Sequence, residues 1–244
     1  VHYAGLPVEM DEIMSLGLPV IEDAAHAVAS QYKGTACGNI GTVGIFSYDA
    51  VKNLTVGEGG GIASPQSELI SRAKTLRYCG IGKSGFDSVQ TNQSGRWWEY
   101  NISEPFIKML PTNIAAAIGI EQLKKIDSLQ ERRKQIWDEY SEAFGSCDKI
   151  TIPLEAPTYS THSYFTYCIR VSNRDDLARY LLEQGIYTTL RYHPLHLNPI
   201  YGQTDRCLPN CETLNHDALS IPIHPRLKHE EVEKVISCIL QFFK

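Results

Sequence analysis

Two apolar runs constrain the fold most: LPVIED at residues 18–23 and GTVGIFSYD at residues 41–49. The first is apolar almost throughout, which is typical of a strand buried on both faces of a parallel sheet. GGIASP at residues 60–65 is a third candidate strand. Residues 8–17 and 67–80 predict amphipathic helices, each closed by a glycine, and the second has a serine of the capping type at its start. This alternation predicts an α/β fold with a mainly parallel sheet.

The second half of the chain predicts a separate, smaller unit. Apolar residues at helical spacing over residues 112–144 indicate a long helical region that bends or breaks. Beyond it, the pattern predicts a strand at 164–171, a helix at 174–185, a strand at 187–192, an irregular proline-rich stretch, and a final helix at 229–243. We therefore expect two domains, residues 1–125 and a small C-terminal α/β domain at residues 126–244. The polar stretch 83–96 predicts a surface loop.

Composition narrows the class of protein. The 244 residues carry a net charge of −5, which argues against a nucleic-acid-binding surface, where a basic stripe is expected. No stretch approaches the roughly 18 consecutive apolar residues of a membrane helix. Seven cysteines without close pairing predict reduced thiols and a cytoplasmic protein. The chain begins at Val1, without an initiator Met, and we expect it to be a fragment of a longer protein.

Three polar residues follow the predicted strands at the edge where α/β proteins bind ligands. Asp23 ends the first strand, Ser47 lies near the end of the second, and Lys52 follows in a loop that continues into glycines. The order is wrong for a nucleotide-binding P-loop, in which the glycines precede the lysine. A lysine, a carboxylate and a hydroxyl suit pyridoxal phosphate (PLP), because they can form a Schiff base, hold the ring nitrogen protonated, and bind phosphate.

Each of these residues also has an ordinary structural interpretation. Asp23 can cap a helix, Ser47 can be structural, and Lys52 can be a surface charge. Only the combination and its spacing favour a cofactor site. The glycines after Lys52 would let backbone and cofactor approach closely.

A metal site is the weaker alternative. Two histidines and two cysteines, His193, His196, Cys207 and Cys211, offer four ligands. The spacing of the cysteines is wider than in zinc knuckles, and two prolines interrupt the segment, so we expect no metal. The absence of a G-x-S-x-G elbow disfavours serine hydrolase chemistry.

The region VIEDAAHAVASQYKGTACGNIGTVGIFSYDAVKNLTVGEGGGI, residues 20–62, resembles the core of the DegT/DnrJ/EryC1/StrS family of sugar aminotransferases. Its E-D-A-A-[QH] element matches Glu22–His26, and its F-S-[FY]-x-x-x-K-N-L-x-x-G-E-G-G element matches Phe46–Gly60. The resemblance continues through AAAIGIEQL, GIYTTLRYHPLH and LSIPIHPRL, and so covers almost the whole chain. It implies the PLP-transferase type I fold, here as a partial large domain without the family's N-terminal part.

The resemblance also implies roles for the matching residues. Lys52 would carry PLP as a Schiff base and shuttle the proton between Cα and the cofactor C4′ carbon. Asp23 would pair with the pyridine nitrogen, His26 would lie by the ring and its O3′ side, and Ser47 would bind the phosphate. A subgroup with histidine in place of the lysine performs dehydration, and Lys52 argues against that chemistry.

The implied reaction is transfer of an amino group from glutamate to a nucleotide-linked keto sugar, in amino-sugar or polysaccharide biosynthesis. A dTDP-4-keto-6-deoxyhexose is the expected substrate, and a GDP-linked or 3-keto sugar remains an alternative. Arg191, His193 and His196 are the candidate substrate-binding residues, although a histidine beside a proline can also be structural. The family implies a homodimer. The alternative is an incomplete fragment or a binding module that lacks half of the cofactor site.

Overall fold

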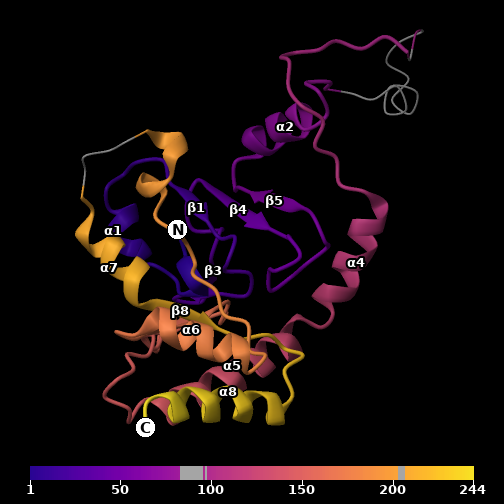
Figure 1. Ribbon diagram of the computed structural model, residues 1–244. Coiled ribbons are helices and arrows are strands. Elements are labelled where there is room, and N and C mark those ends of the chain that lie inside the picture. Colours follow the sequence, from indigo (N-terminus) through magenta and orange to yellow (C-terminus); the bar gives the residue numbers. More distant parts are fainter. Residues whose placement is uncertain (83–95, 97, 203–206) are drawn as a thin grey trace. The chain divides into compact units, whose positions relative to one another are not determined.

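The computed structural model describes residues 1–82, 96, 98–202 and 207–244 (Figure 1). The loop predicted at residues 83–96 therefore lies almost wholly outside the described residues. Contacts divide the described chain into two compact units. Unit 1 comprises Val1–Tyr3 and Pro7–Ile126, and unit 2 comprises Ala4–Leu6 and Asp127–Lys244.

Unit 1 contains the elements α1 (Met10–Met14), β1 (Ile21–Asp23), β2 (Gln31–Tyr32), β3 (Thr35–Ala36), β4 (Val43–Ser47), β5 (Gly60–Ala63), α2 (Ser67–Leu76) and α4 (Asn113–Leu123). The helical region predicted at 112–144 breaks after Leu123, and α5 (Ile126–Phe144) follows. The side chain of Thr112 caps α4 by accepting a hydrogen bond from the backbone N–H of Ala115 at 3.1 Å.

The sheet of unit 1 has the order β1–β4–β5, with β4 in the middle (Figure 1). β1 pairs with β4 in parallel, as the apolar runs predicted, with Asp23 opposite Ile45. β5 pairs antiparallel to β4, because residues 48–59 return the chain directly alongside the strand it has left. The sheet is therefore mixed, with one parallel and one antiparallel pairing among these strands.

The register assigns side chains to the two faces of this sheet, since neighbours across a ladder share a face and successive residues alternate. Ile21, Asp23, Ile45, Ser47 and Ile62 share the front face. On the back face, Phe46 packs on a small buried cluster. This cluster consists of Ala24, Ala27 and Cys37.

The front face is the open one. The exposed fractions of Ile21 and Ile62 are 70% and 56%. The expected strand burial on both faces is therefore wrong for the described chain, because its core lies on the back of the sheet alone.

The helix ends of unit 1 differ in detail from the sequence interpretation. α1 is shorter than predicted, and Gly17, at φ +65°, closes its last turn by donating to the Met14 carbonyl at 3.1 Å. Ser67 is the first residue of α2 and not its cap; Gln66 occupies that position, and no side chain caps the helix. Gly80, at φ +76°, follows α2 and donates to the carbonyl of Thr75 at 3.1 Å.

Unit 2 is built on the antiparallel pair β7 (Tyr167–Arg170) and β8 (Ala218–Ile221). Around it lie α5, α6 (Arg174–Glu183) and α8 (His229–Phe242), and the unit also contains β6 (Ser160–Thr161), η2 (Leu195–Leu197), η3 (Pro199–Tyr201) and α7 (Pro209–Asp217). The short η1 (Tyr3–Gly5) contributes residues to both units. The apolar faces of α5, α6 and α8 converge on the strand pair, and the core residues include Tyr140, Phe144, Ile169, Leu177, Leu219 and Ile239.

Two sequence predictions in unit 2 were wrong. The strand expected at residues 187–192 reduces to a single bridge, in which Thr189 and Ser220 exchange both backbone hydrogen bonds. The stretch interpreted as irregular contains α7 and the fully buried β8. The mostly apolar sequence ALSI at residues 218–221 could have predicted β8.

All seven cysteines carry free thiols. Among the described residues, no helix is both long enough and apolar enough to cross a membrane.

Candidate functional site

Asp23 is the last residue of β1, and one of its two carboxylate oxygens is hydrogen-bonded. Its Oδ1 accepts a hydrogen bond from the backbone N–H of Ala25 at 3.0 Å. Within the described part of the chain, the other oxygen, Oδ2, has no hydrogen-bond partner. The main chain of Asp23 is also held, because its carbonyl accepts from the backbone N–H of His2 at 3.0 Å. Asp23 thus presents one available carboxylate oxygen on a fixed backbone.

Ser47 is the last residue of β4 and shares the front face with Asp23. The two are offset by two residues along the parallel pair, since Asp23 lies opposite Ile45. The Ser47 hydroxyl accepts from the Asp49 backbone N–H at 3.4 Å, and its proton has no acceptor among the described residues. The structure therefore brings a carboxylate and a hydroxyl donor to one edge and one face of the sheet.

Lys52 lies in the loop that joins β4 to β5, and it is half-buried. Tyr48 closes the base of this loop: its N–H donates to the Gly59 carbonyl and its carbonyl accepts from the Val56 N–H, both at 2.9 Å. Inside the loop, the Lys52 backbone N–H donates to the Asp49 carbonyl at 3.0 Å. The residues that follow, Asn53 and Leu54, are buried and anchor the loop.

The glycines after Lys52 are explained by contacts within the chain. A Cβ on Gly59 would lie 2.8 Å from the Val56 side chain, and a Cβ on Gly60 would lie 2.9 Å from the Phe46 carbonyl oxygen. A Cβ on Gly61 would lie 2.8 Å from the Tyr48 hydroxyl. The sequence interpretation gave these glycines to a cofactor, whereas each makes room for residues of β4 and its loop.

His26 follows Asp23 by three residues and is half-buried. Its ring lies 5.8 Å from the ring of Tyr3, with the planes tilted by 60°. Both residues belong to unit 1.

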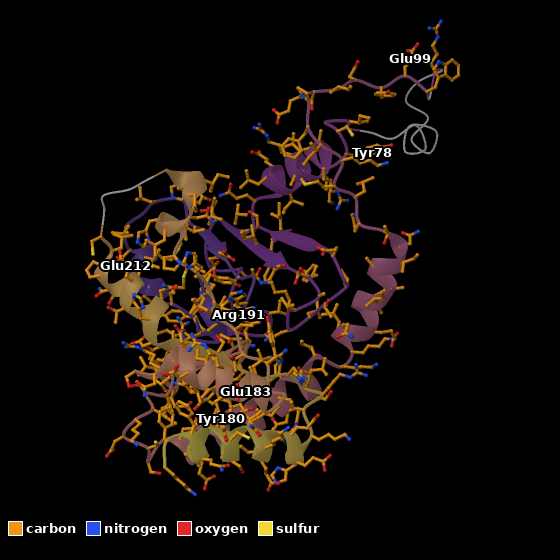
Figure 2. The ribbon with its side chains drawn as sticks, viewed as in Figure 1. Tyr78, Glu99, Tyr180, Glu183, Arg191 and Glu212 are labelled. Atoms are coloured by element: carbon orange, nitrogen blue, oxygen red, sulfur yellow. The ribbon has the colours of Figure 1, made fainter. Side chains whose placement is uncertain are left out.

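The three candidate substrate residues lie in unit 2 and differ in their surroundings. The Arg191 guanidinium lies 5.1 Å from the centre of the Phe165 ring, a cation–π contact. His196 Nε2 lies 3.0 Å from Glu212 Oε1 on α7, where Figure 2 labels Glu212. A hydrogen bond from the Leu208 N–H, and then the one with His196, lowers the Glu212 pKa. His193 is exposed and makes no such contact among the described residues.

The described residues of the segment that holds these histidines form no metal centre. Among the described residues, no group of three or more His, Cys, Asp or Glu side chains is placed to hold a metal ion. The neighbouring Cys207 is exposed, and the negative charge of Glu212 raises the pKa of its thiol.

One buried residue was missed by the sequence interpretation, which used Glu22 only as a letter of a motif. It directly precedes Asp23 in β1, and its side chain is buried on the back face of the sheet. Burial alone would disfavour its ionised form, but hydrogen bonds from Gly41, Gly38, His2 and Ile40 outweigh this and lower the pKa of Glu22. A charged residue inside an otherwise apolar run was the available signal.

Comparisons with known proteins identify the family of this chain. A family model described as the DegT/DnrJ/EryC1/StrS aminotransferase family matches residues 1–240. The dTDP-4-dehydro-2,3,6-trideoxy-D-glucose 4-aminotransferase of Saccharopolyspora spinosa is 37% identical over 241 residues, which cover 96% of this chain and 62% of that protein. The spore coat polysaccharide biosynthesis protein SpsC of Bacillus subtilis is 31% identical, with 100% of this chain and 66% of that protein covered. The chain thus spans less than two thirds of these relatives' length.

A solved structure gives the same answer for the fold. The aminotransferase TlmJ from Streptoalloteichus hindustanus superposes with a TM-score of 0.88 at 34% identity, covering 100% of this chain and 65% of that one. This likeness confirms the expected α/β, PLP-transferase type I fold. Aminotransferases of the matching family depend on PLP, and solved neighbours include pyridoxal and pyridoxamine phosphate forms.

Proposed function

The chain belongs to the DegT/DnrJ/EryC1/StrS aminotransferase family, and we propose that it serves the PLP-dependent transfer of an amino group from glutamate to a nucleotide-linked keto sugar. The observation that carries the proposal is the placement of Asp23 and Ser47 on one open face of β1 and β4, with Lys52 in the next loop. A 4-keto-6-deoxyhexose linked to dTDP is the proposed substrate, because a relative at 37% identity is named for a dTDP-linked 4-keto sugar. The product would enter amino-sugar or polysaccharide biosynthesis in the cytoplasm.

The residues of unit 1 fit PLP by their chemistry. The Oδ2 atom of Asp23, which has no partner among the described residues, would accept a hydrogen bond from a protonated ring nitrogen. Ser47 would donate its hydroxyl proton to the phosphate. His26 would lie by the ring, on its O3′ side.

Lys52 would attach the cofactor covalently and move the proton between the substrate Cα and the cofactor C4′ carbon. When bound, PLP supplies an electron-accepting ring that stabilises negative charge on the carbon that loses its proton. We also propose that residues 1–125 are the C-terminal portion of a large, cofactor-binding domain, and that residues 126–244 form the small domain.

In unit 2, we propose Arg191, His193 and His196 as contacts to the sugar nucleotide. Their surroundings suit them to different roles in binding. His193 is exposed and has no hydrogen-bond partner among the described residues, whereas His196 is already held by Glu212 and would position the segment. The Arg191 guanidinium would attract a phosphate or carboxylate. A homodimer is the proposed assembly.

Covalent labelling tests the proposal. The protein is incubated with PLP and treated with borohydride, which reduces the linkage to a stable amine, and the labelled peptide is identified by mass spectrometry. We expect the cofactor's mass on the peptide that contains Lys52. The Lys52→Ala variant should lose the label, and Lys74→Ala, which removes an exposed lysine of α2 in the same unit, should keep it.

Label on another lysine, or none at all, would contradict the proposed site. A complete absence of label would favour the alternative, a binding module or an incomplete fragment. If the label falls on Lys52, a panel of 4-keto and 3-keto nucleotide sugars with glutamate then identifies the acceptor.

A further inference from the structure

The carboxylate of Glu22 collects four hydrogen-bond donors on the back of the sheet. Its Oε1 accepts from the backbone N–H groups of Ile40 at 2.7 Å and Gly41 at 2.5 Å. Its Oε2 accepts from the Gly38 N–H at 2.8 Å and lies 2.9 Å from His2 Nε2. Only 2% of Glu22 and 1% of His2 are exposed. Every lone pair of a buried carboxylate is therefore satisfied, three of the four by one loop.

His2 connects Glu22 to Asp23. Its Nδ1 accepts from the Val8 backbone N–H at 3.2 Å, so the proton of the neutral ring lies on Nε2 and points at Glu22. The backbone N–H of the same residue donates to the Asp23 carbonyl at 3.0 Å. The side chain of His2 therefore holds Glu22 while its main chain holds Asp23.

The loop at residues 38–41 leads directly into β4 and packs closely against its backbone. A Cβ on Gly44 would overlap the carbonyl oxygen of Gly38, and Gly44 lies opposite Glu22 in the parallel ladder. A Cβ on Gly41 would lie 2.8 Å from the carbonyl oxygen of Val20, just before β1. The Glu22 carboxylate thus connects β1 to the chain that enters β4, in a region where the two backbones are closely packed.

We infer that Glu22 is a positioning residue for Asp23: it fixes β1 against the 38–41 loop from behind, so that Asp23 and Ser47 stay aligned on the front face. The inference rests on the proposed function, in which Asp23 holds the ring nitrogen. Because side chains alternate along β1, Glu22 points away from the front face and acts only through the backbone. The titratable groups that face it are His2 and Cys37, and burial together with the charge of Glu22 raises the pKa of Cys37 to about 12.

Two backbone amides report on this alignment without any cofactor. The Ala25 N–H is bonded to Asp23 Oδ1 itself, and the Ala24 N–H donates to the Ile45 carbonyl across the β1–β4 pair at 2.9 Å. Glu22→Gln keeps the shape of the side chain but replaces one acceptor oxygen with an NH₂ group that faces backbone donors. We expect amide hydrogen exchange at Ala24 and Ala25 to accelerate about tenfold or more, since buried hydrogen bonds to a charged group are lost.

The control is Met10→Ala, which removes a fully buried side chain from α1 in the same unit. Both variants are compared at temperatures that leave each equally far below its own melting temperature. A merely structural role for Glu22 would give both variants the same exchange at Ala24 and Ala25, and this result would overturn the inference. If Glu22→Gln does not fold, His2→Phe removes one of the four donors and should accelerate the same two amides to a smaller degree.

The dissociation constant for PLP, measured by fluorescence titration, gives the second readout. It should rise about tenfold in Glu22→Gln relative to Met10→Ala. If the unmodified protein binds no PLP, the proposed function fails, and the exchange rates still decide the role of Glu22. If it binds PLP and both variants bind it equally, the inference fails and the proposed function stands.

Discussion

The carbonyl oxygen of Gly38 occupies the space in which a side chain at position 44 would lie, so Gly44 and the 38–41 loop pack backbone against backbone. We expect Gly44→Ala to lower the free energy of unfolding by about 1–3 kcal/mol or more, because no rotamer change can relieve an overlap with main chain. Urea unfolding followed by circular dichroism measures the loss.

Gly82→Ala is the matched control for Gly44→Ala. Among the described residues, a Cβ at that position would meet nothing within 4 Å, and Gly82 does not have positive φ. Its stability should be unchanged or slightly increased, as the unfolded chain loses freedom. Equal destabilisation by both substitutions would contradict the packing described for Gly44.

The sequence was sufficient to predict the parts of the site that depend on order along the chain. The apolar runs before Asp23 and within β4 predicted neighbouring parallel strands, and the register then placed Asp23 and Ser47 on one face. Glu22 could not be found in this way, because its partners are backbone amides of a later loop and His2. Every residue except proline carries a backbone N–H, so residue types do not show which of these donors a side chain will bind.

The errors in unit 2 have a related cause. The β-branched and aromatic residues at 187–192 favour an extended chain, but a strand also needs a partner with consecutive free donors and acceptors. β8 pairs along its whole length with β7, and in the described part of the chain only Thr189 pairs with its other edge. Pairing partners of this kind are set by tertiary structure, which local propensity does not contain.

A buried histidine should make unit 2 sensitive to moderate acid. His162 is 5% exposed, with ring centroids 4.8 Å from Trp137 and 4.6 Å from Tyr164, and this burial lowers its pKa to about 4 although a hydrogen bond with the Ala4 backbone opposes the shift. The unfolded chain, with a histidine pKa near 6.5, binds the proton first as the pH falls. Stability should therefore decline from about pH 6.5 to pH 4, by about 3 kcal/mol in total.

Chemical unfolding at several pH values measures this decline. His162→Phe keeps an aromatic ring beside Trp137 and cannot titrate, so its stability should change less between pH 7 and pH 4 than that of the unmodified protein. Identical pH profiles for the two proteins would show that folding does not lower the pKa of His162.

Substitutions of the two candidate substrate histidines should differ in their effects on stability and on KM. His193 is exposed, with no hydrogen bond to the rest of the described chain, so His193→Ala should leave the melting temperature unchanged. If it contacts the sugar nucleotide, KM for that substrate should rise about tenfold. Steady-state kinetics and thermal melting on the same preparation test both statements, and an unchanged KM would remove His193 from the site.

His196→Ala should behave differently, because it breaks the 3.0 Å contact between His196 and Glu212 on α7. We expect a lower melting temperature and faster proteolysis near α7, together with any change in KM. His196→Gln retains a donor that can reach Glu212 and should recover most of the stability. A melting temperature unaffected by His196→Ala would show that the contact contributes nothing to the fold.

The contact between Gly61 and Tyr48 predicts a specific rescue. A Cβ at position 61 would lie 2.8 Å from the Tyr48 hydroxyl oxygen but 3.4 Å from the nearest ring carbons, so the hydroxyl alone is in the way. Gly61→Ala should cost about 1–3 kcal/mol, because the half-buried Tyr48 must shift at the base of the loop that carries Lys52. In a Tyr48→Phe background the obstructing atom is gone, and the same substitution should cost clearly less.

A double-mutant cycle over Gly61→Ala and Tyr48→Phe measures this coupling from four unfolding curves. We expect the double variant to be about 1 kcal/mol more stable than the sum of the two single changes predicts. Strict additivity would mean that the cost of Gly61→Ala arises elsewhere, and the glycine would then be required by something other than Tyr48. Because Tyr48 closes the loop of Lys52 through both of its backbone hydrogen bonds, Gly61→Ala should also lower the yield of borohydride labelling at Lys52, and Tyr48→Phe should restore it.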